Sequence, residues 1–248
     1  LYGIFSDSVQ GDKVIAEIAT NFGVETEYGD GFILLTKNDH PIDEIFNYDF
    51  VLCPDLAQTV SVMMAGLGVR GTLTGLQTLR IKETDRILAL QQELQRVGVK
   101  VDDKGKADLM EQKGRCDFQT TPSFDTYEDH RMAMSFASLA IFQKVQINEP
   151  GVVSKSYPAF WEDLEKVGFQ IEAIPGPPGK REMTRAIKME FPKIEGDNSK
   201  EGFINVDVFS KENPAESIQE TIEIIQEEIS ILLYFNSFSG LINDYPIL

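Results

Sequence analysis

The most chemically suggestive stretch of this sequence is a dense run of charge at residues 79–86, which an apolar helix pattern follows directly. Lys82, Glu83 and Arg86 lie where that helix would begin. Free backbone N–H groups and the helix dipole favour an anion at such an end. Two cations and a carboxylate beside a helix N-terminus therefore predict a site for a phosphate or a carboxylate.

The helix that must position these charges is predicted at residues 87–97. Its apolar residues recur at steps of three and four, which is the pattern of one helix face. Thr84 or Asp85 can supply the N-cap oxygen, and Gly98 suits the left-handed position after the last turn. Taken alone, such a stretch is more often a well-capped helix with a solvated first turn.

Further charged side chains precede other predicted helices. Asp55 opens an apolar helix, His130 and Arg131 open a second, and Lys155 lies shortly before a third. Each also has a structural interpretation, with Asp55 as a plain N-cap, His130 as a core or capping residue and Lys155 as a solvated surface side chain. Their joint occurrence is what favours a shared site.

A structural repeat connects these helix starts. Helix, glycine and strand follow one another at Gly23, Gly98 and Gly168, which are 75 and 70 residues apart. Asp55 and Asp129, which open the other class of helix, are 74 residues apart. Two markers with one period indicate repeated units of two helices and about four strands, with the chemistry at helix N-termini.

Strands are predicted between these helices. Residues 24–27 and 32–36 have the pattern of an antiparallel pair around a glycine-rich turn, and Phe50–Cys53 has that of a buried strand. The fold class predicted from this alternation is α/β, of the α+β type.

Length and charge exclude several classes of protein. With 248 residues, 42% of them hydrophobic, the chain can form one large domain or two smaller ones with a real core. The net charge of -17 argues against a nucleic-acid partner, because such proteins usually carry a basic face. No apolar run approaches the length of a membrane span, so we expect no membrane partner.

The two cysteines, Cys53 and Cys116, match neither a metal-ligand spacing nor a disulfide framework. We therefore expect no metal and a reducing, cytoplasmic location. The sequence shows no signal peptide and begins at Leu1 without a methionine, which predicts a fragment or a processed product.

Four motifs occur in one order along the chain: Pro54–Thr59, Arg80–Arg86, Asp129–Met134 and Lys155–Pro158. Together they resemble the C-terminal half of the EPSP synthases, the 3-phosphoshikimate 1-carboxyvinyltransferases. The likeness covers about residues 1–171. No one of these motifs would be specific alone, whereas their combination is a strong signal.

The resemblance implies an inside-out α/β barrel domain of repeated βαβαββ units around a pseudo-threefold axis, with helices inside and sheets outside. Residues 1–173 would form this domain. The first visible unit begins at its second helix, so the domain would be incomplete at its N-terminus. The N-terminal domain of the same enzyme would then be a partner that lies outside this chain.

The resemblance also implies a reaction without a cofactor or a metal. In that family the carboxyvinyl group of phosphoenolpyruvate passes to the 5-hydroxyl of shikimate 3-phosphate, and phosphate leaves through a tetrahedral addition intermediate. Matched by motif, Asp55 would orient or deprotonate the hydroxyl. Lys82 and Glu83 would exchange protons with the carbon of phosphoenolpyruvate, and which of them takes which step stays open.

Substrate binding falls to further matched positions. Arg86, Arg131 and Lys155 would hold the phosphate and carboxylate of phosphoenolpyruvate, since forked and point-charge donors suit these groups. His130 would shape the site as their neighbour.

Shikimate 3-phosphate would contact Asp55, Lys82 and Thr78. Thr78 lies near the sequence position at which many relatives carry a polar residue that contacts shikimate. The family's N-terminal half supplies further lysine, arginine and serine contacts that this chain lacks. Half of the substrate clamp is therefore expected to come from elsewhere.

The composition changes from residue 174 onward. Residues 174–182 are rich in proline and glycine, which predicts a stiff, exposed linker. Residues 183–248 resemble no family, and strands are predicted at 189–191 and 203–209 with an acidic helix at 216–234. We expect this extension to be a small α+β appendage without chemistry.

Two alternatives to an EPSP synthase fragment remain open. The related enolpyruvyl transferase acting on UDP-N-acetylglucosamine shares the fold, but Lys82–Arg86 and Asp129–Arg131 favour the shikimate enzyme. A non-catalytic interaction protein would keep the barrel as a scaffold and bind a partner through its acidic tail. The intact motifs argue against the scaffold, and the missing half argues for it. We expect the chain to be inactive alone and active when joined to an N-terminal half.

Overall fold

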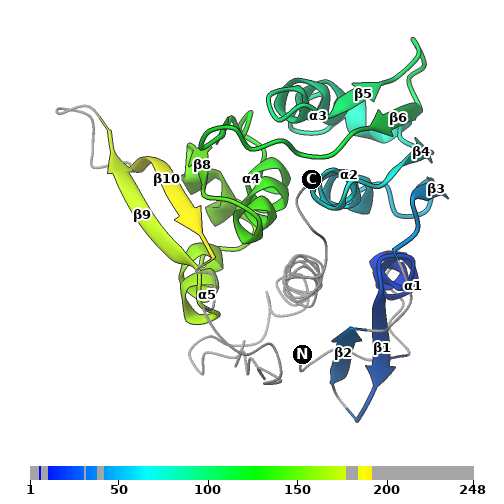
Figure 1. Ribbon diagram of the computed structural model, residues 1–248, viewed down its shortest axis with the longest axis horizontal. Helices are drawn as coiled ribbons and strands as arrows, with labels where there is room; N and C mark the ends of the chain where they lie inside the picture. The colour runs from blue at the N-terminus through cyan, green and yellow to red at the C-terminus, as the bar shows by residue number, and fades with distance from the viewer. Residues whose placement is uncertain (1–5, 7–10, 31, 38–41, 177–183, 192–248) are drawn as a thin grey trace.

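The computed structural model describes residues 6, 11–30, 32–37, 42–176 and 184–191 (Figure 1). These residues form a mixed α/β fold with one two-stranded and two four-stranded sheets. The first elements are the 3₁₀ helix η1 (Gly11–Val14), α1 (Ile15–Thr20), β1 (Val24–Tyr28) and β2 (Ile33–Lys37). β1 and β2 pair antiparallel, which confirms the hairpin predicted there.

The next stretch is a βαβαββ unit with a four-stranded sheet. Its elements are β3 (Ile45–Asp49), α2 (Leu56–Leu67), β4 (Arg70–Thr74), η2 (Gln77–Ile81), α3 (Arg86–Gln95), β5 (Lys100–Asp102) and β6 (Leu109–Lys113). β3 and β4 run parallel, because α2 carries the chain back between them. β6 pairs antiparallel with β4 and with β5, which gives the order β3-β4-β6-β5.

The following stretch repeats this unit. Its elements are β7 (Ser123–Phe124), α4 (His130–Ala137), η3 (Ser138–Ile141), β8 (Val145–Asn148), η4 (Pro150–Lys155), α5 (Phe160–Lys166), β9 (Gln170–Pro175) and β10 (Thr184–Glu190). β7 and β8 are parallel, the other pairs are antiparallel, and the order is β7-β8-β10-β9. The two sheets therefore share one topology, which confirms the predicted repeat.

β10 lies in the stretch from residue 183 onward, which was expected to form a separate extension. It lies between β8 and β9 in the sheet of the second unit, where β6 lies in the first. Its residues Ala186, Ile187 and Met189 are buried in the core. β9 itself includes residues 174 and 175, the first of the predicted linker.

The proline and glycine residues between β9 and β10 predict a linker, and they do not indicate that the chain returns to the same sheet. The strand predicted at 203–209 and the helix predicted at 216–234 lie outside the described residues.

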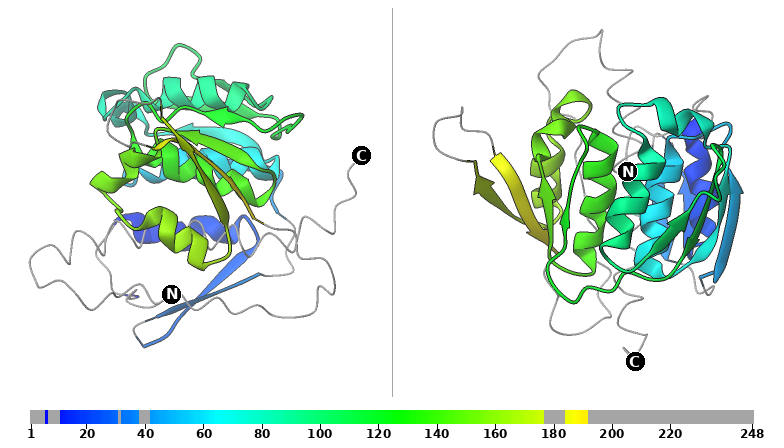
Figure 2. Two further views of the ribbon diagram at one scale, coloured as in Figure 1. Left: turned by 90° about the vertical axis from the view of Figure 1, so that its left-hand side faces the viewer. Right: turned by 90° about the horizontal axis from the view of Figure 1, so that it is seen from above.

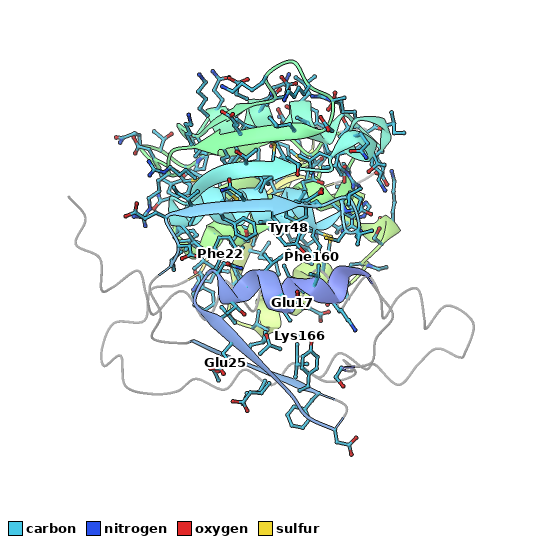
Figure 3. All side chains as sticks on the ribbon, turned by 90° about the vertical axis from the view of Figure 1, so that its right-hand side faces the viewer. Glu17, Phe22, Glu25, Tyr48, Phe160 and Lys166 are labelled. Carbon is cyan, nitrogen blue, oxygen red and sulfur yellow. The ribbon has the colours of Figure 1, made fainter. Side chains whose placement is uncertain are left out.

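The strand predicted at Phe50–Cys53 is wrong, because the chain turns there and β3 precedes it. Phe46 and Tyr48 of β3 point to the same side of the strand, and their rings stack 5.8 Å apart. Phe22, after α1, packs against Phe46 with ring centroids 5.0 Å apart, on the side of the sheet where Figure 3 shows α1. The strand is therefore the segment in which buried and exposed residues alternate, and the apolar residues at 50–53 lie beyond its end.

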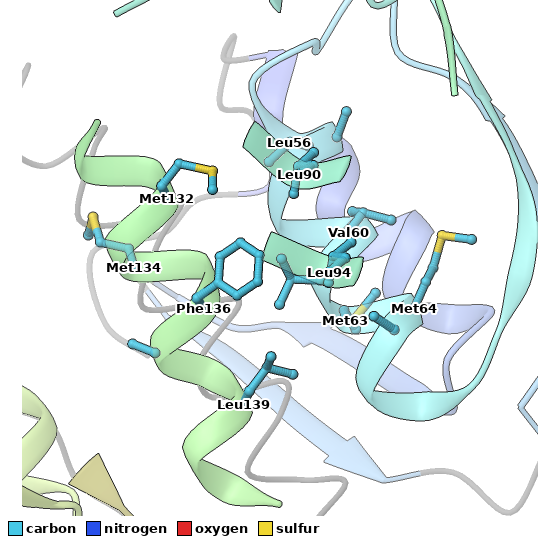
Figure 4. Packing of buried hydrophobic residues seen from close by; sticks show 14 of the residues in the cluster. Leu56, Val60, Met63, Met64, Leu90, Leu94, Met132, Met134, Phe136 and Leu139 are labelled. Atoms are coloured by element: carbon cyan, nitrogen blue, oxygen red, sulfur yellow. The ribbon is translucent and has the colours of Figure 1, made fainter. Parts of the chain in front are cut away.

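Helices α2 and α4 lie side by side between the two four-stranded sheets (Figures 1 and 2). Every residue from Leu56 to Gly66 is buried, as expected for a helix that is covered on all sides. Figure 4 shows Phe136 of α4 projecting toward the apolar side chains of α2 and α3. Thr59 and Ser135 meet across α2 and α4 with their hydroxyl oxygens 2.9 Å apart.

Candidate active site

Asp55 precedes α2, but its carboxylate does not cap that helix. Asp55 Oδ1 lies 2.9 Å from Nη1 of Arg86 and 3.2 Å from Nζ of Lys82. Asp55 Oδ2 lies 3.6 Å from Nη2 of Arg131. The plain N-cap interpretation of Asp55 is therefore wrong, since three cations from three different segments meet at this carboxylate.

Arg86 is the buried centre of the cluster, with 1% of the residue exposed. Its Nε donates to Oδ2 of Asp129 at 2.6 Å, its Nη1 to Asp55 at 2.9 Å and its Nη2 to Glu83 at 2.8 Å. Asp129 is itself fully buried. Such pairing is required here, because a buried charge without partners is strongly unfavourable.

Two of the helix starts are fixed by aspartate caps. Asp85 is the N-cap of α3, and its carboxylate accepts from the backbone N–H of Leu88 at 3.0 Å, which confirms one of the two predicted caps. Asp129 is the N-cap of α4 and accepts from the backbone N–H of Arg131 at 2.8 Å. The caps fix where each helix begins and so place Arg86 and Arg131 in their first turns.

Two carboxylates of the cluster are held in the ionised form. Burial raises the pKa of Asp55, but the charges of Arg131, Arg86 and Lys82 outweigh it and keep that pKa below its ordinary value. Burial also raises the pKa of Glu83, whereas a hydrogen bond from its own backbone and the charge of Arg86 lower it by more. At neutral pH both side chains can accept a proton.

His130 is held in the neutral form. Burial lowers its pKa first, and the charges of Arg131 and Arg86 lower it further, against the opposing effect of Asp129 and Glu83. Its Nδ1 lies 4.0 Å from Oδ1 of Asp129, which is beyond hydrogen-bond range. A neutral imidazole at this position offers one donor and one acceptor to a ligand.

Thr78 and Lys155 are not joined to this cluster by any contact between described residues. Thr78 is exposed on η2. Lys155 is exposed at the end of η4, a segment that packs against α4. Their assignment to substrate binding stays a prediction.

Asp129 is a member of the cluster that sequence reasoning did not place in the site. Its signals in the sequence were its registry with Asp55 and its position next to His130 and Arg131. Its bonds to Arg86 span 43 residues and depend on how α3 packs beside α4. A contact between residues so far apart in sequence cannot be predicted from a local sequence pattern.

The cluster balances positive and negative charge locally, in a chain of net charge -17. Its members are Lys82, Arg86 and Arg131 on one side and Asp55, Glu83 and Asp129 on the other. A ligand with phosphate or carboxylate groups can bind by replacing a carboxylate. Glu83 is the easiest to replace, because its side chain is 41% exposed.

The described residues include no group of three or more histidine, cysteine, aspartate and glutamate side chains that could hold a metal ion. Among the helices of this part of the chain, none has the length and apolar character needed to cross a membrane.

Comparison with known proteins identifies the family of this chain. The family model of EPSP synthase, 3-phosphoshikimate 1-carboxyvinyltransferase, matches residues 1–164. A 3-phosphoshikimate 1-carboxyvinyltransferase of Bacteroides fragilis is 49% identical over 173 residues, which are 69% of this chain and 42% of the relative. The enzyme of that name from Sulfurovum sp. is 34% identical over 173 residues, 66% of this chain and 38% of the relative.

Among solved structures, the EPSP synthase of Acinetobacter baumannii aligns with 65% of this chain and 40% of its own, with 22% identity and a TM-score of 0.43. The chain thus spans about two fifths of the length of the curated relatives it matches. The family match covers well over half of the chain and includes each of the described site segments. The chain therefore belongs to the EPSP synthase family.

Proposed function

We propose that this chain is the C-terminal part of a 3-phosphoshikimate 1-carboxyvinyltransferase, which transfers the carboxyvinyl group of phosphoenolpyruvate to the 5-hydroxyl of shikimate 3-phosphate. The carrying observation is the meeting of Lys82, Arg86 and Arg131 at Asp55, in a chain of this family. The names of the relatives support these substrates over a UDP-sugar.

The proposed reaction needs a base for the hydroxyl and two proton transfers at the methylene carbon. Asp55, ionised beside three cations, suits the role of base. The hydroxyl oxygen then bonds to the central carbon of phosphoenolpyruvate, while the methylene gains a proton and becomes a methyl group. Loss of a methyl proton and departure of phosphate restore the double bond. We assign the donation to Lys82 and the removal to Glu83, because Glu83 is held ionised.

Anion binding would reorganise the contacts of Arg86. Four donor contacts of its guanidinium already go to Asp129, Asp55 and Glu83. A phosphate or carboxylate that replaces Glu83 would release this carboxylate for proton transfer. Arg131 would provide a second forked donor, with Lys155 and Thr78 joining from η4 and η2.

The other half of the enzyme is the proposed partner. Leu52 and Ile81, near Asp55 and Lys82 in sequence, are 86% and 84% exposed. Large exposed apolar side chains so near the cluster in sequence support a surface that another domain covers. The length of the relatives leaves room for that domain outside this chain.

We propose further that the described chain is most of one inside-out barrel domain with pseudo-threefold symmetry. The two complete βαβαββ units support this arrangement, and α1, β1 and β2 would be the end of a third unit. The domain would run through β10.

The test is phosphate release from phosphoenolpyruvate and shikimate 3-phosphate, with this chain alone and with the N-terminal half of the Bacteroides fragilis relative added. We expect activity only in the mixture. Within the mixture, Arg131→Gln should lower turnover at least about 100-fold, since an anion-binding charge acts in the transition state. Arg70→Gln removes an exposed charge far from the cluster and should leave turnover unchanged.

Each outcome has a distinct meaning. Activity of this chain alone would contradict the shared site. A folded chain that associates with the N-terminal half without turnover would contradict the enzyme and favour the scaffold alternative.

A further inference from the structure

The turn before α4 has an unusual backbone for its residue types. Tyr127 and Glu128 have positive φ angles of 53° and 58°, and the N–H of Asp129 bonds to the carbonyl of Thr126 at 2.9 Å. Two central residues with positive φ and this closing bond are the marks of a type I′ turn. Such turns favour asparagine, aspartate and glycine, because other side chains clash with the backbone there.

This turn therefore needs support from outside itself. Left-handed residues that are neither glycine nor asparagine persist where the surrounding structure over-determines them, and they concentrate at functional sites. Neither Tyr127 nor Glu128 has a local reason for its conformation, so the supporting contacts must come from another element.

The support comes from Glu93 on α3. The hydroxyl of Tyr127 donates to Oε1 of Glu93 at 2.5 Å, and the backbone N–H of Asp125 donates to its Oε2 at 3.1 Å. One carboxylate thus binds the segment at residues 125 and 127. The Glu93 side chain is fully buried, and Arg96 pairs with it at 3.2 Å. A buried carboxylate with this many partners fixes its neighbours in one geometry.

The turn leads directly into the proposed active site. The carboxylate of Asp129, the last residue of the turn, accepts two hydrogen bonds. One comes from Nε of Arg86 at 2.6 Å and the other from the backbone N–H of Arg131 at 2.8 Å. A change in the backbone at Tyr127 would displace Asp129 after a single intervening residue. The position of α4's first turn therefore depends on the conformation of this turn.

We propose that Glu93 and Tyr127 are positioning residues, which hold the turn at residues 126–129 and thereby aim Asp129, His130 and Arg131 at the anion. Their effect on catalysis rests on the proposed function, whereas their effect on geometry does not. Neither residue touches the site cluster, so both act through the turn. The side-chain oxygen of Gln92, also on α3, lies 2.8 Å from the same hydroxyl oxygen.

The first test measures geometry without substrate. Tyr127→Phe deletes the hydroxyl but keeps the ring, and Glu93→Gln removes the charge at almost unchanged shape. Tyr157→Phe is the matched control, because the Tyr157 hydroxyl makes an equivalent bond of 2.5 Å to Asp163 of α5, a helix that carries no member of the site cluster. Amide hydrogen exchange at Arg131 and the NMR titration of His130 report on the site, and the sequence contains only one other histidine, His40.

We expect exchange at the Arg131 amide to become at least tenfold faster in Tyr127→Phe and Glu93→Gln, beyond any change in global stability. The His130 pKa should rise toward its ordinary value as the cluster loosens. Tyr157→Phe should change neither quantity. If Tyr127→Phe behaves like Tyr157→Phe at both probes, the positioning role is refuted.

A second substitution tests the backbone argument. Asparagine accepts positive φ more readily than glutamate, so Glu128→Asn should stabilise the turn without help from α3. The double variant Tyr127→Phe/Glu128→Asn should regain at least half of the lost protection at Arg131. An absence of rescue would contradict the view that Tyr127 holds a strained turn.

The activity arm separates this inference from the proposed function. In the mixture with an N-terminal half, Tyr127→Phe should raise KM for phosphoenolpyruvate at least tenfold, with a smaller effect on KM for shikimate 3-phosphate. Equal effects on both would contradict anion positioning. If the unmodified mixture is inactive, the proposed function fails, and the exchange and titration measurements still decide the positioning role.

Discussion

Arg86 belongs both to the charged cluster and to the buried interior of the protein. Motif and helix position predict an anion-binding arginine, while the structure gives its guanidinium three carboxylate partners and almost no exposure. The buried bond to Asp129 is structural in character. The bonds to Asp55 and Glu83 involve partly exposed side chains, and under the proposed function they are the bonds that a ligand would replace.

Replacement of Asp129 by asparagine should destabilise the fold by about 3 kcal/mol or more, because one partner of a buried pair is lost and Arg86 keeps its charge. Glu83→Gln is the matched control. The Glu83 side chain is 41% exposed, so its loss should cost no more than about 1 kcal/mol. Denaturant unfolding followed by circular dichroism measures both, and equal losses would contradict the division of Arg86 contacts.

The pH dependence of stability should carry a signature of His130. Burial lowers its pKa in the folded state, so the unfolded chain takes up the proton first as the pH falls below about 6.5. The free energy of unfolding should therefore decrease as the pH falls through this window, by at most about 1.4 kcal/mol per pH unit from this group. Above it, the neutral form in both states gives no slope.

His130→Gln removes that contribution. The difference in unfolding free energy between the wild type and this variant should therefore change between pH 7 and pH 5, with other groups cancelling. A difference that stays constant over this range would show that His130 titrates normally in the folded protein.

Much of the candidate site could be predicted from residue types and spacing. Lys82, Glu83, Arg86 and Arg131 all lie at or near helix starts. The structure brings Lys82, Arg86 and Arg131 to Asp55, and Glu83 to Arg86. What could not be predicted is which partner each charge would choose. Pairing at this distance depends on packing between helices, and sequence spacing contains no measure of it.

At the scale of elements, β3 pairs parallel with β4, and the turn after β3 leads to Asp55 at the start of α2. Gly71 lies where the two strands touch, and a Cβ added there would fall 1.6 Å from the carbonyl oxygen of Phe46. No rotation of a side chain can relieve a clash with backbone. Glycine is therefore required at this position for the strands to approach.

Gly71→Ala should lower the free energy of unfolding by more than about 2 kcal/mol, since β3 and β4 must separate. Gly151→Ala provides the control, because a Cβ at Gly151 meets nothing within 4 Å and should change stability by no more than about 0.5 kcal/mol. Thermal and denaturant unfolding of the two variants would measure this. Similar stabilities would mean that the strands can shift to accept a methyl group.

The elements that sequence reasoning misplaced share a physical cause. Phe50–Cys53 is as apolar as a strand, but the sheet ends before it because β4 offers no further partner. β10 has no recognisable family pattern, yet it pairs with β8 and buries Ala186, Ile187 and Met189. Strand pairing is decided by neighbours that are distant in sequence, whereas helix starts and caps are decided locally. The helices were accordingly the better predicted elements.

At the scale of the whole molecule, the second unit is complete only with residues beyond the family match. β9 has β10 as its partner in the described sheet, and β10 contributes Ile187 and Met189 to the core. Further contacts extend the connection, among them the ring contact of Phe191 with Phe169 at 5.1 Å. The described residues after residue 164 therefore contribute to the stability of the domain.

Truncation provides a direct measure of this dependence. A chain that ends at Gly176 should lose cooperative unfolding of the second unit, because β9 has no strand to pair with and the core below β10 is exposed. A chain that ends at Phe191 should keep it. Amide exchange in β8 and β9 distinguishes the two, and equal protection would show that β10 is dispensable.

The position of β10 also has a consequence for the order of events on the ribosome. β9 leaves the ribosomal exit tunnel before β10, yet it reaches the rest of its sheet through β10 alone. At roughly 5–20 residues per second, the first unit has several seconds to fold before the last strand of the second is available. A nascent chain that has emerged from the tunnel only as far as residue 176 would therefore hold one finished sheet and one open edge, which is where a chaperone would be expected to bind.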